Sequence, residues 1–189
     1  MSSSTPLPAF VSRGGDKLSA ALDHFGIDVT GLVCADLGSH VGGFVDCLLR
    51  RGAARVDSVD TAYGTLAWRL RRDPRVAVHE RTNAMHVTLL EPVDLVTIDV
   101  GWTTQAKILP NAATLLREGG IVVTLIKPHY EAPKELLVDG VLPEFALDDV
   151  LAAVRAGIES LGWSVRDTMT SPIRGHGGNR EVFALLARL

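Results

Sequence analysis

Short apolar segments alternate with amphipathic ones along most of the chain, and this alternation constrains the fold more than any other feature. The apolar segments are expected to be strands and cover residues 32–38, 55–60, 76–80, 93–100 and 121–127. Helical periodicity occupies residues 42–52, residues 65–72, a segment that ends near Arg117, and residues 143–162. Strands that alternate with helices form a parallel sheet with helices on both faces.

The end of the chain departs from this alternation. The strand-like segments 163–169 and 181–187 have only the Gly-rich stretch SPIRGHGGN between them, so we expect them to pair antiparallel. The sequence therefore predicts an α/β fold with a seven-stranded, mostly parallel sheet and an antiparallel C-terminal strand. The polar segment 128–143 is longer than most connections and is a candidate lid or substrate loop.

Composition narrows the class of protein further. Of 189 residues, 47% are hydrophobic and 22% charged, and the net charge of −3 provides no global basic field for nucleic acid. Cys34 and Cys47 lack CxxC spacing and the histidines lack metal-ligand spacing, so we expect no metal site. The chain has no membrane-spanning apolar run and no secretory signal, which favours a cytoplasmic protein. We interpret residues 1–9 as a flexible leader and residues 10–189 as one domain.

A glycine-rich turn, DLGSHVGGF, follows the first predicted strand and opens the helix after it. Its spacing is neither that of a dinucleotide site nor that of a P-loop. Glycines at this place let a ligand approach the backbone, and Asp36, Asp60 and Asn83 come at three successive strand ends, where doubly wound sheets bind ligands. A plain strand–turn–helix junction with a capping aspartate is the alternative interpretation.

This pattern resembles the Rossmann-like, class I methyltransferases, which use S-adenosylmethionine. The resemblance implies that the glycines lie under the methionine moiety, that Asp60 meets the ribose and that Asn83 meets the adenine. The residues expected to bind the cofactor are Asp36, Gly38, Ser39, His40, Gly42, Gly43, Phe44, Asp60, Asn83 and Asp99.

Within that class, the chain is similar to the TlyA family, whose members are often named hemolysins and belong to the FtsJ-like ribose methyltransferases. The similar blocks run in order from about Phe10 to the C-terminus and are FVSRGGDKL, DLGSHVGGFVDCLLRRGA, YGTLAWRLRRDPRV, ERTNA, PVDLVTIDV, LIKPHYE and SPIRGHGGNREVF. The resemblance implies 2′-O-methylation of RNA ribose, with ribosomal RNA as the expected substrate, by a Lys–Asp–Lys–Glu set. The matching catalytic residues are Lys17, Asp99, Lys127 and Glu181.

The chemistry suits these residue types. Asp99 and Lys127 end neighbouring predicted strands, so they should meet at the ligand edge of the sheet. Lys17, expected at the start of the first helix beside a capping Asp16, gains a role if it completes this cluster. We interpret Lys127 as the general base or the group that positions the hydroxyl, Lys17 as its electrostatic neighbour, and both carboxylates as orienting partners. Four solvated charges at element ends are the alternative.

Several features keep other functions open. TlyA proteins usually carry an N-terminal RNA-binding domain, whereas only a short leader precedes Phe10 here. The glycine loop reads SHVGG where the family usually has ASTGG, and VGWTT follows Asp99 where the family usually has VSFIS. A non-catalytic cofactor-binding regulator, or a methyltransferase for a small molecule, is therefore an alternative. RNA remains the expected partner, either through arginines between Arg50 and Arg75 or through base stacking on Trp102 and Tyr130.

Overall fold

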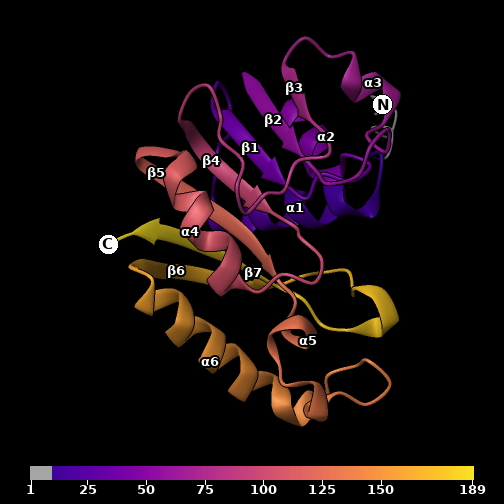
Figure 1. Cartoon of the computed structure of the whole chain (residues 1–189), viewed down its shortest axis with the longest axis vertical. Coiled ribbons are helices and arrows are strands. Elements are labelled where there is room, and N and C mark those ends of the chain that lie inside the picture. The colour runs from indigo at the N-terminus through magenta and orange to yellow at the C-terminus, as the bar shows by residue number, and fades with distance from the viewer. Residues whose placement is uncertain (1–9) are drawn as a thin grey trace, which may run out of the picture.

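The computed structural model describes residues 10–189, which are built around one seven-stranded sheet (Figure 1). The strands lie in the order β3-β2-β1-β4-β5-β7-β6. Their bounds are β1 Val33–Leu37, β2 Arg55–Val59, β3 Val76–His79, β4 Val93–Ile98, β5 Leu116–Ile126, β6 Trp163–Thr170 and β7 Val182–Arg188. The leader interpreted for residues 1–9 lies outside the described residues.

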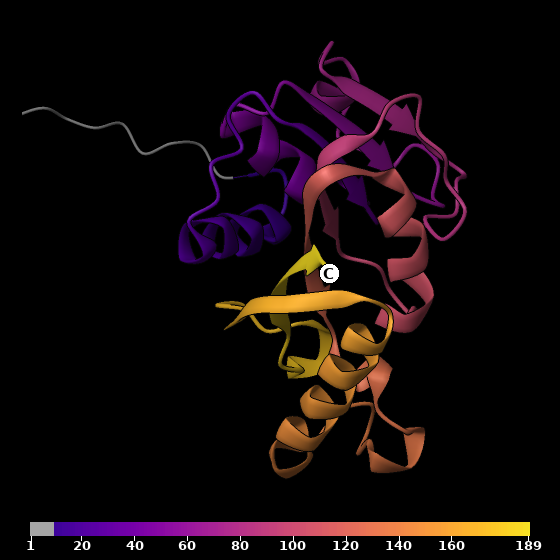
Figure 2. The same cartoon turned by 90° about the vertical axis from the view of Figure 1, so that its left-hand side faces the viewer.

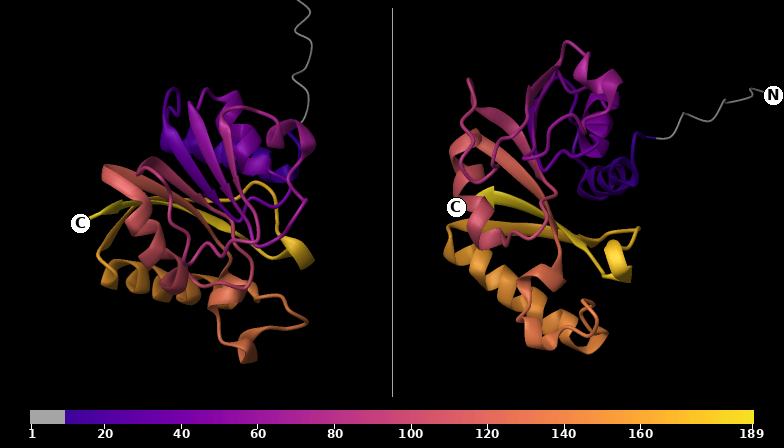
Figure 3. Two further views of the ribbon diagram at one scale, coloured as in Figure 1. Left: turned by 45° about the horizontal axis from the view of Figure 1, so that its top comes forward. Right: turned by 45° about the vertical axis from the view of Figure 1, so that its right-hand side comes forward.

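The directions of the strands confirm the prediction from the sequence. β1 pairs in parallel with β2 and β4, and the parallel pairing continues from β2 to β3 and from β4 to β5. β7 runs antiparallel to both of its neighbours, β5 and β6. The carboxyl ends of β1 to β5 therefore meet at one edge of the sheet, where an open α/β fold binds its ligands (Figure 3).

Helices cover both faces of this sheet. The helices are α1 Arg13–Phe25, α2 Gly43–Arg50, α3 Trp68–Arg71, α4 Gln105–Leu115, α5 Pro128–Glu131 and α6 Leu147–Ser160, and single 3-10 turns are η1 Lys134–Leu136, η2 Glu144–Ala146 and η3 His176–Gly178. Figure 2 shows α1 and α4 on opposite sides of the strands. None of the described helices is long and apolar enough to span a membrane.

Two apolar clusters hold these layers together. On one face, α1 and α2 bury Leu18, Leu22 and Leu48 against strand residues that include Phe183. On the other face, α4 and α6 pack on a second cluster whose largest member is the fully buried Trp163. Successive residues of a strand point to opposite faces of the sheet. On β1, Cys34 therefore belongs to the first cluster and Ala35 to the second. Burial of this apolar surface is the main stabilising term for such a sheet.

The first helix begins earlier than the sequence indicates. Ser12, not Asp16, is the N-cap, and its hydroxyl accepts a hydrogen bond from the Gly14 N–H at 3.3 Å. Lys17 therefore lies within α1 rather than at its first residue. The helix ends at Phe25, and its C-cap Gly26 adopts the left-handed conformation that glycine tolerates at this position (φ 65°).

Two other boundaries are set by contacts between distant segments. The helix predicted for residues 65–72 is reduced to α3, because the Ala67 N–H donates to the Val41 carbonyl at 3.1 Å instead of joining a helix. The helix expected to run to about Arg117 ends at Leu115, because Leu116 pairs with Val93 and starts β5. Within the segment 128–143, predicted as a loop, α5 and η1 form two short turns.

Candidate active site

Asp99 and Lys127 follow β4 and β5, two neighbouring parallel strands, so their side chains leave the sheet side by side. The Lys127 ammonium (Nζ) forms an ion pair with Asp99, 2.6 Å from its Oδ1, and it donates a hydrogen bond to the Val100 carbonyl at 3.1 Å. The Lys127 side chain is only 16% exposed. The structure therefore places a lysine with fixed partners at the ligand edge, as the sequence indicates.

Lys17 and Glu181 form a second, more deeply buried ion pair. Lys17 Nζ lies 2.6 Å from Glu181 Oε2, and the two side chains are 13% and 4% exposed. The lysine comes from α1 and the glutamate directly precedes β7, so the pair joins the two ends of the described chain. Because little water reaches this pair, its electrostatic effect on the surroundings is screened less than that of a surface pair.

The candidate catalytic residues thus form two ion pairs, and each pair lies beside a cavity. Two cavities open at this edge of the sheet, a large one of about 680 Å³ and a small one of about 280 Å³. Asp99 lines both of them, Lys127 lines the large cavity and Lys17 the small one. Gly38 and His40 are the other residues common to both cavities, so the glycine loop forms the partition between them.

Gly38 is needed at this partition because the backbone comes very close. Its φ is 92°, and a Cβ added to it would lie 2.3 Å from the Asp99 carbonyl oxygen. Gly42 also has a positive φ, of 98°, but it faces the side chains of Leu66 and Leu70 and lines neither cavity. The structure thus gives Gly42 a packing role, and its contact with a cofactor stays a prediction.

The small cavity lies between the glycine loop and the start of α1. Ser39, Gly43 and Phe44 line it, and so does Asp36. Thr97 Oγ1 donates to Asp36 Oδ1 at 2.8 Å, whereas the buried Asp36 Oδ2 has no hydrogen-bond partner. Burial raises the pKa of this carboxyl to about 7, and the Thr97 hydrogen bond only partly offsets that effect.

Asp60 and Asn83 line the large cavity, at the ends of β2 and β3. Asp60 accepts backbone hydrogen bonds from His40 at 2.7 Å and from Ala62 at 2.8 Å, and the first of these holds His40 at a φ of 47°. Asn83 Oδ1 accepts the Met85 N–H at 2.9 Å. Both polar side chains are therefore oriented by the backbone that surrounds them.

Sequence reasoning singled out only Lys17 from the FVSRGGDKL block and missed its neighbours. Ser12, Arg13 and Gly14 also line the small cavity, because the first turn of α1 packs on the glycine loop. The sequence of this block could have indicated them, because glycines beside a cation at the start of a helix permit a ligand to come close to the backbone. Trp102 and Tyr130 stack on each other at 4.8 Å and line the large cavity.

Most of the arginines that the sequence offered as phosphate contacts have acidic partners. Ion pairs occupy Arg50, Arg51, Arg55, Arg69, Arg71 and Arg75. Within residues 10–189, Arg72 and Arg81 enter no ion pair, and each lies over an exposed aromatic ring, Trp68 at 5.6 Å and Tyr63 at 4.4 Å. Arg81 was not among the candidates, although it belongs to the ERTNA block.

Nothing in the described part of the chain resembles a metal centre. No group of three or more His, Cys, Asp or Glu side chains in that part is placed to hold an ion. Cys34 and Cys47 are buried free thiols, and burial raises the pKa of each to about 12, which keeps both protonated and unreactive.

The sheet order, the glycine loop and the cavities beside it define a Rossmann-like methyltransferase fold. The S-adenosylmethionine-dependent methyltransferase from Mesorhizobium loti shares it, with a TM-score of 0.67 at 16% identity, over 93% of this chain and 100% of that one. The chain itself belongs to the FtsJ-like methyltransferase family, whose family model matches residues 10–188.

Two relatives support this assignment. The 16S/23S rRNA (cytidine-2′-O)-methyltransferase TlyA of Mycobacterium tuberculosis is 42% identical over 184 residues, which is 94% of this chain and 68% of that protein. A solved structure from Streptococcus thermophilus, assigned to the hemolysins, has a TM-score of 0.92 at 36% identity and covers 97% of this chain and 69% of that one. The family resemblance predicted from the sequence is confirmed.

Proposed function

We propose that this chain transfers a methyl group from S-adenosylmethionine to a ribose 2′-hydroxyl of RNA, with ribosomal RNA as the substrate and the cytoplasm as the place of action. We further propose that residues 10–189 act as one catalytic domain. The observation that carries the proposal is the Lys127–Asp99 pair at 2.6 Å, on the wall of a cavity that adjoins the glycine loop. The name of the M. tuberculosis relative supports the choice of ribose and of ribosomal RNA.

The two cavities suit the two halves of S-adenosylmethionine. The amino-acid half carries an ammonium and a carboxylate, and the small cavity offers the unpartnered Asp36 oxygen and the Arg13 cation. The adenosine half needs hydrogen-bonding partners for its ribose and base, and the large cavity offers Asp60 and Asn83. Gly38 at the partition lets the glycine loop pack directly against the Asp99 backbone, which brings the two cavities together. The residues of this site thus fit the cofactor that the family uses.

The protein's part in the reaction is to place and prepare the acceptor. The bound cofactor supplies a methyl group on a positively charged sulfur, and the acceptor oxygen has to approach it in line. Lys127 positions the 2′-hydroxyl or, once its own proton has passed to water, accepts the hydroxyl proton. Asp99 holds the Lys127 ammonium in place. Across the glycine loop, the buried Lys17–Glu181 pair holds a second ammonium in place beside the small cavity.

RNA has aromatic and cationic groups to bind at or near this edge, although Asp60 and Asp99 also line the large cavity. Trp102 is 86% exposed and stacks on Tyr130, while Lys127 lies 5.9 Å from the centre of the Tyr130 ring. Arg72 and Arg81 lie over two further exposed rings. Exposed rings and guanidinium planes are the groups on which single-stranded bases stack.

We predict that Trp102→Ala weakens RNA binding without affecting the cofactor. Stacking on one base contributes about 1–3 kcal/mol, so KM for RNA should rise by about 5-fold to 150-fold. Binding of S-adenosylhomocysteine should be unchanged, and calorimetry with that compound is the control. An unchanged KM for RNA would remove Trp102 from the acceptor site.

The proposed function is tested by binding and labelling in sequence. Calorimetry with S-adenosylhomocysteine comes first, followed by transfer of labelled methyl groups from S-adenosylmethionine to pools of RNA and of small molecules. Robust labelling of RNA supports the proposal. Binding without labelling of any pool identifies a non-catalytic regulator, and labelling confined to small molecules identifies a different acceptor; either result contradicts the proposal.

A further inference from the structure

The three consecutive residues Asn179, Arg180 and Glu181 connect two distant parts of the molecule. Asn179 and Arg180 bind the arm, which we define as residues 132–146 between α5 and α6. Glu181, the next residue, binds Lys17 of α1. The arm and the turn of residues 175–179 lie at the same end of the sheet (Figure 3). A shift of the arm therefore acts on the residue beside the catalytic glutamate.

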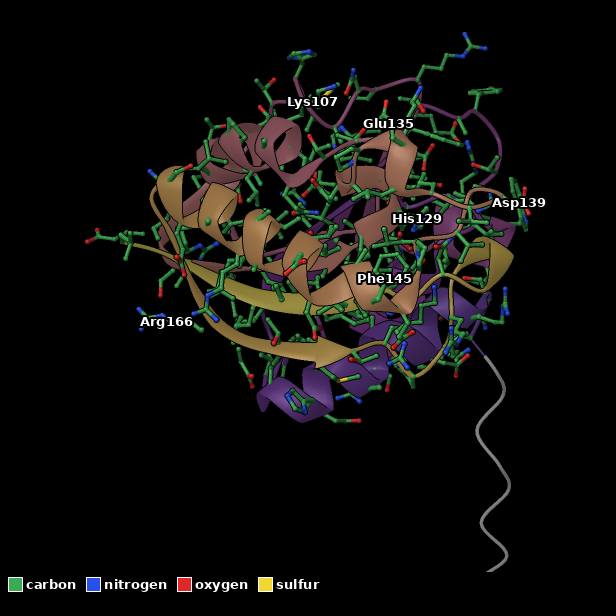
Figure 4. The ribbon with its side chains drawn as sticks, turned by 90° about the horizontal axis from the view of Figure 1, so that it is seen from below. Lys107, His129, Glu135, Asp139, Phe145 and Arg166 are labelled. Atoms are coloured by element: carbon green, nitrogen blue, oxygen red, sulfur yellow. The ribbon has the colours of Figure 1, made fainter. Side chains whose placement is uncertain are left out.

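The side chain of Asn179 binds the backbone of the arm through one donated and one accepted hydrogen bond. The arm folds back in a tight hairpin in which Val138 and Val141 pair, and Asp139 marks its tip in Figure 4. The side-chain oxygen of Asn179 accepts the Leu142 N–H at 3.1 Å, and its amide nitrogen donates to the Gly140 carbonyl at 3.1 Å. Asn179 is only 4% exposed, so water cannot readily replace either hydrogen bond.

Arg180 adds a weaker link to the same arm. Its guanidinium binds both carboxylate oxygens of Glu144, at 3.0 and 2.8 Å. Both side chains are exposed, at 39% and 65%, and exposed ion pairs contribute little to stability. The buried Asn179 is therefore the principal connection between the arm and the turn.

On its other side the turn supports the Glu181 carboxylate. The Gly175 N–H donates to the Asn179 carbonyl at 2.9 Å, which closes the turn. A Cβ on Gly175 would lie 2.2 Å from Glu181 Oε1, so the carboxylate packs directly against this glycine. The Glu181 carbonyl also accepts the Ser171 N–H at 2.9 Å. The position of Glu181 thus depends on this turn, which the main-chain carbonyl of Asn179 closes and the side chain of Asn179 connects to the arm.

The arm is also connected to Lys127 through α5, which starts at the next residue. Glu131 at the end of α5 accepts the Gln105 N–H at 2.8 Å and fixes α5 to the start of α4. The arm is therefore connected to one candidate catalytic lysine through α5 and, through Asn179, to the turn that supports the partner of the other.

We propose that Asn179 is a positioning residue for methyl transfer. Its side chain holds the arm against the turn of residues 175–179. This contact keeps Glu181, and with it Lys17, in a fixed position relative to Lys127. It lines neither cavity, so its effect on methyl transfer is indirect. This inference rests on the proposed function for the reaction that it serves, but the mechanical link that it describes can be measured without catalysis.

Asn179→Ala removes both side-chain hydrogen bonds to the arm and should lower kcat by about 10-fold to 100-fold, because small misplacements of catalytic groups have effects of this size. KM for S-adenosylmethionine and the affinity for S-adenosylhomocysteine should not change. Asn111→Ala is the comparison, because the side chain of Asn111, like that of Asn179, makes two hydrogen bonds to the backbone of a distant segment; here it donates both, to the carbonyls of Ala84 and Val87. Ala84 lines the large cavity, so this variant should raise KM for the cofactor and leave kcat near its original value.

Hydrogen exchange of the whole chain tests the link independently of activity. In Asn179→Ala the amides of Leu142 and Ser171 should both exchange faster, and in Asn111→Ala neither should. Should the alanine variant fail to fold, Asn179→Asp keeps the acceptor for Leu142, loses the donor to Gly140 and should show the same changes to a smaller degree.

The outcomes separate the two proposals. Three results would overturn the role of Asn179. The first is a wild-type kcat in Asn179→Ala, and the second is an equal effect of both asparagine variants on the same kinetic constants. The third is faster exchange of the Leu142 amide without faster exchange of the Ser171 amide. If the wild-type protein methylates no RNA, the proposed function fails. Exchange at Ser171 then still decides whether Asn179 couples the arm to Glu181.

Discussion

Replacing Lys127 by alanine is expected to abolish methyl transfer while cofactor binding persists. Lys127 is the cation paired with Asp99 at 2.6 Å, and it faces the large cavity from the end of β5. Removal of a positioned acid or base typically lowers a rate by about 10²–10⁴-fold, and we expect a loss of this size in kcat. The affinity for S-adenosylhomocysteine should stay within about threefold, because an interaction used only in the transition state does not contribute to ground-state binding.

The matched control for this prediction is Lys107→Ala. Lys107 is an exposed lysine on α4 that lines neither cavity, and Figure 4 shows it on the outer surface. The variant changes the net charge by the same amount and should retain full activity. Single-turnover transfer to RNA measures both variants, and an undiminished rate in Lys127→Ala would remove the catalytic assignment.

Replacing Asp36 by asparagine should make the protein more stable and its cofactor binding weaker. Burial raises the pKa of Asp36 to about 7 from an ordinary value of 3.8, so the folded state holds a proton that the unfolded state has lost between these pH values. The free energy of unfolding of the wild type therefore falls as the pH rises from about 4 to 7, and it is level above that range. Asparagine carries no such proton, and at pH 8 the variant should be more stable by up to about 4 kcal/mol.

The same substitution removes the charge that we propose for the cofactor ammonium. A hydrogen bond to a charged group contributes about 1.5–3 kcal/mol, so the affinity for S-adenosylhomocysteine should fall by at least about tenfold. Thermal unfolding at pH 4 and pH 8, together with calorimetry, measures both effects. A variant that is less stable than the wild type at pH 8, or that binds the cofactor equally well, would contradict the role given to Asp36.

Asp57→Asn is the comparison for this prediction. Asp57 is also fully buried on a neighbouring strand, but its carboxylate lies 2.7 Å from His79 and 3.1 Å from Arg55. Its substitution leaves Arg55 with only the exposed Glu91, at 3.8 Å, as an acidic partner among the described residues and should lower stability. Opposite signs in the two variants would show that the absence of an ion-pair partner at Asp36 within the described chain, and not burial alone, sets its effect.

The fold could be predicted because its information is local. Runs of Val, Leu and Ile of strand length, broken by turns and amphipathic helices, are sufficient to indicate a parallel sheet covered on both sides. The boundaries that differ depend on partners elsewhere in the chain. The end of α4 is set by the pairing of Leu116 with Val93, and the short α3 by the bond from Ala67 to Val41. Neither contact has a signature in its own segment.

The same distinction applies to the candidate site. Asp99 and Lys127 could be brought together from the sequence, because parallel strands that are neighbours end at the same edge. The pairing of Lys17 with Glu181, across 164 positions, followed only from the family resemblance. The hydrogen bonds from Asn179 to the arm could not be predicted, because an asparagine in a Gly-rich stretch is expected to form hydrogen bonds within its own turn.

The position of the transferred methyl group tests the central claim most directly. The wild-type protein is incubated with RNA and labelled S-adenosylmethionine, the RNA is digested to nucleosides, and mass spectrometry locates the label. The account predicts a label on the ribose 2′-oxygen that disappears with Lys127→Ala and persists with Lys107→Ala. A label on a base, or on no nucleoside at all, would contradict it.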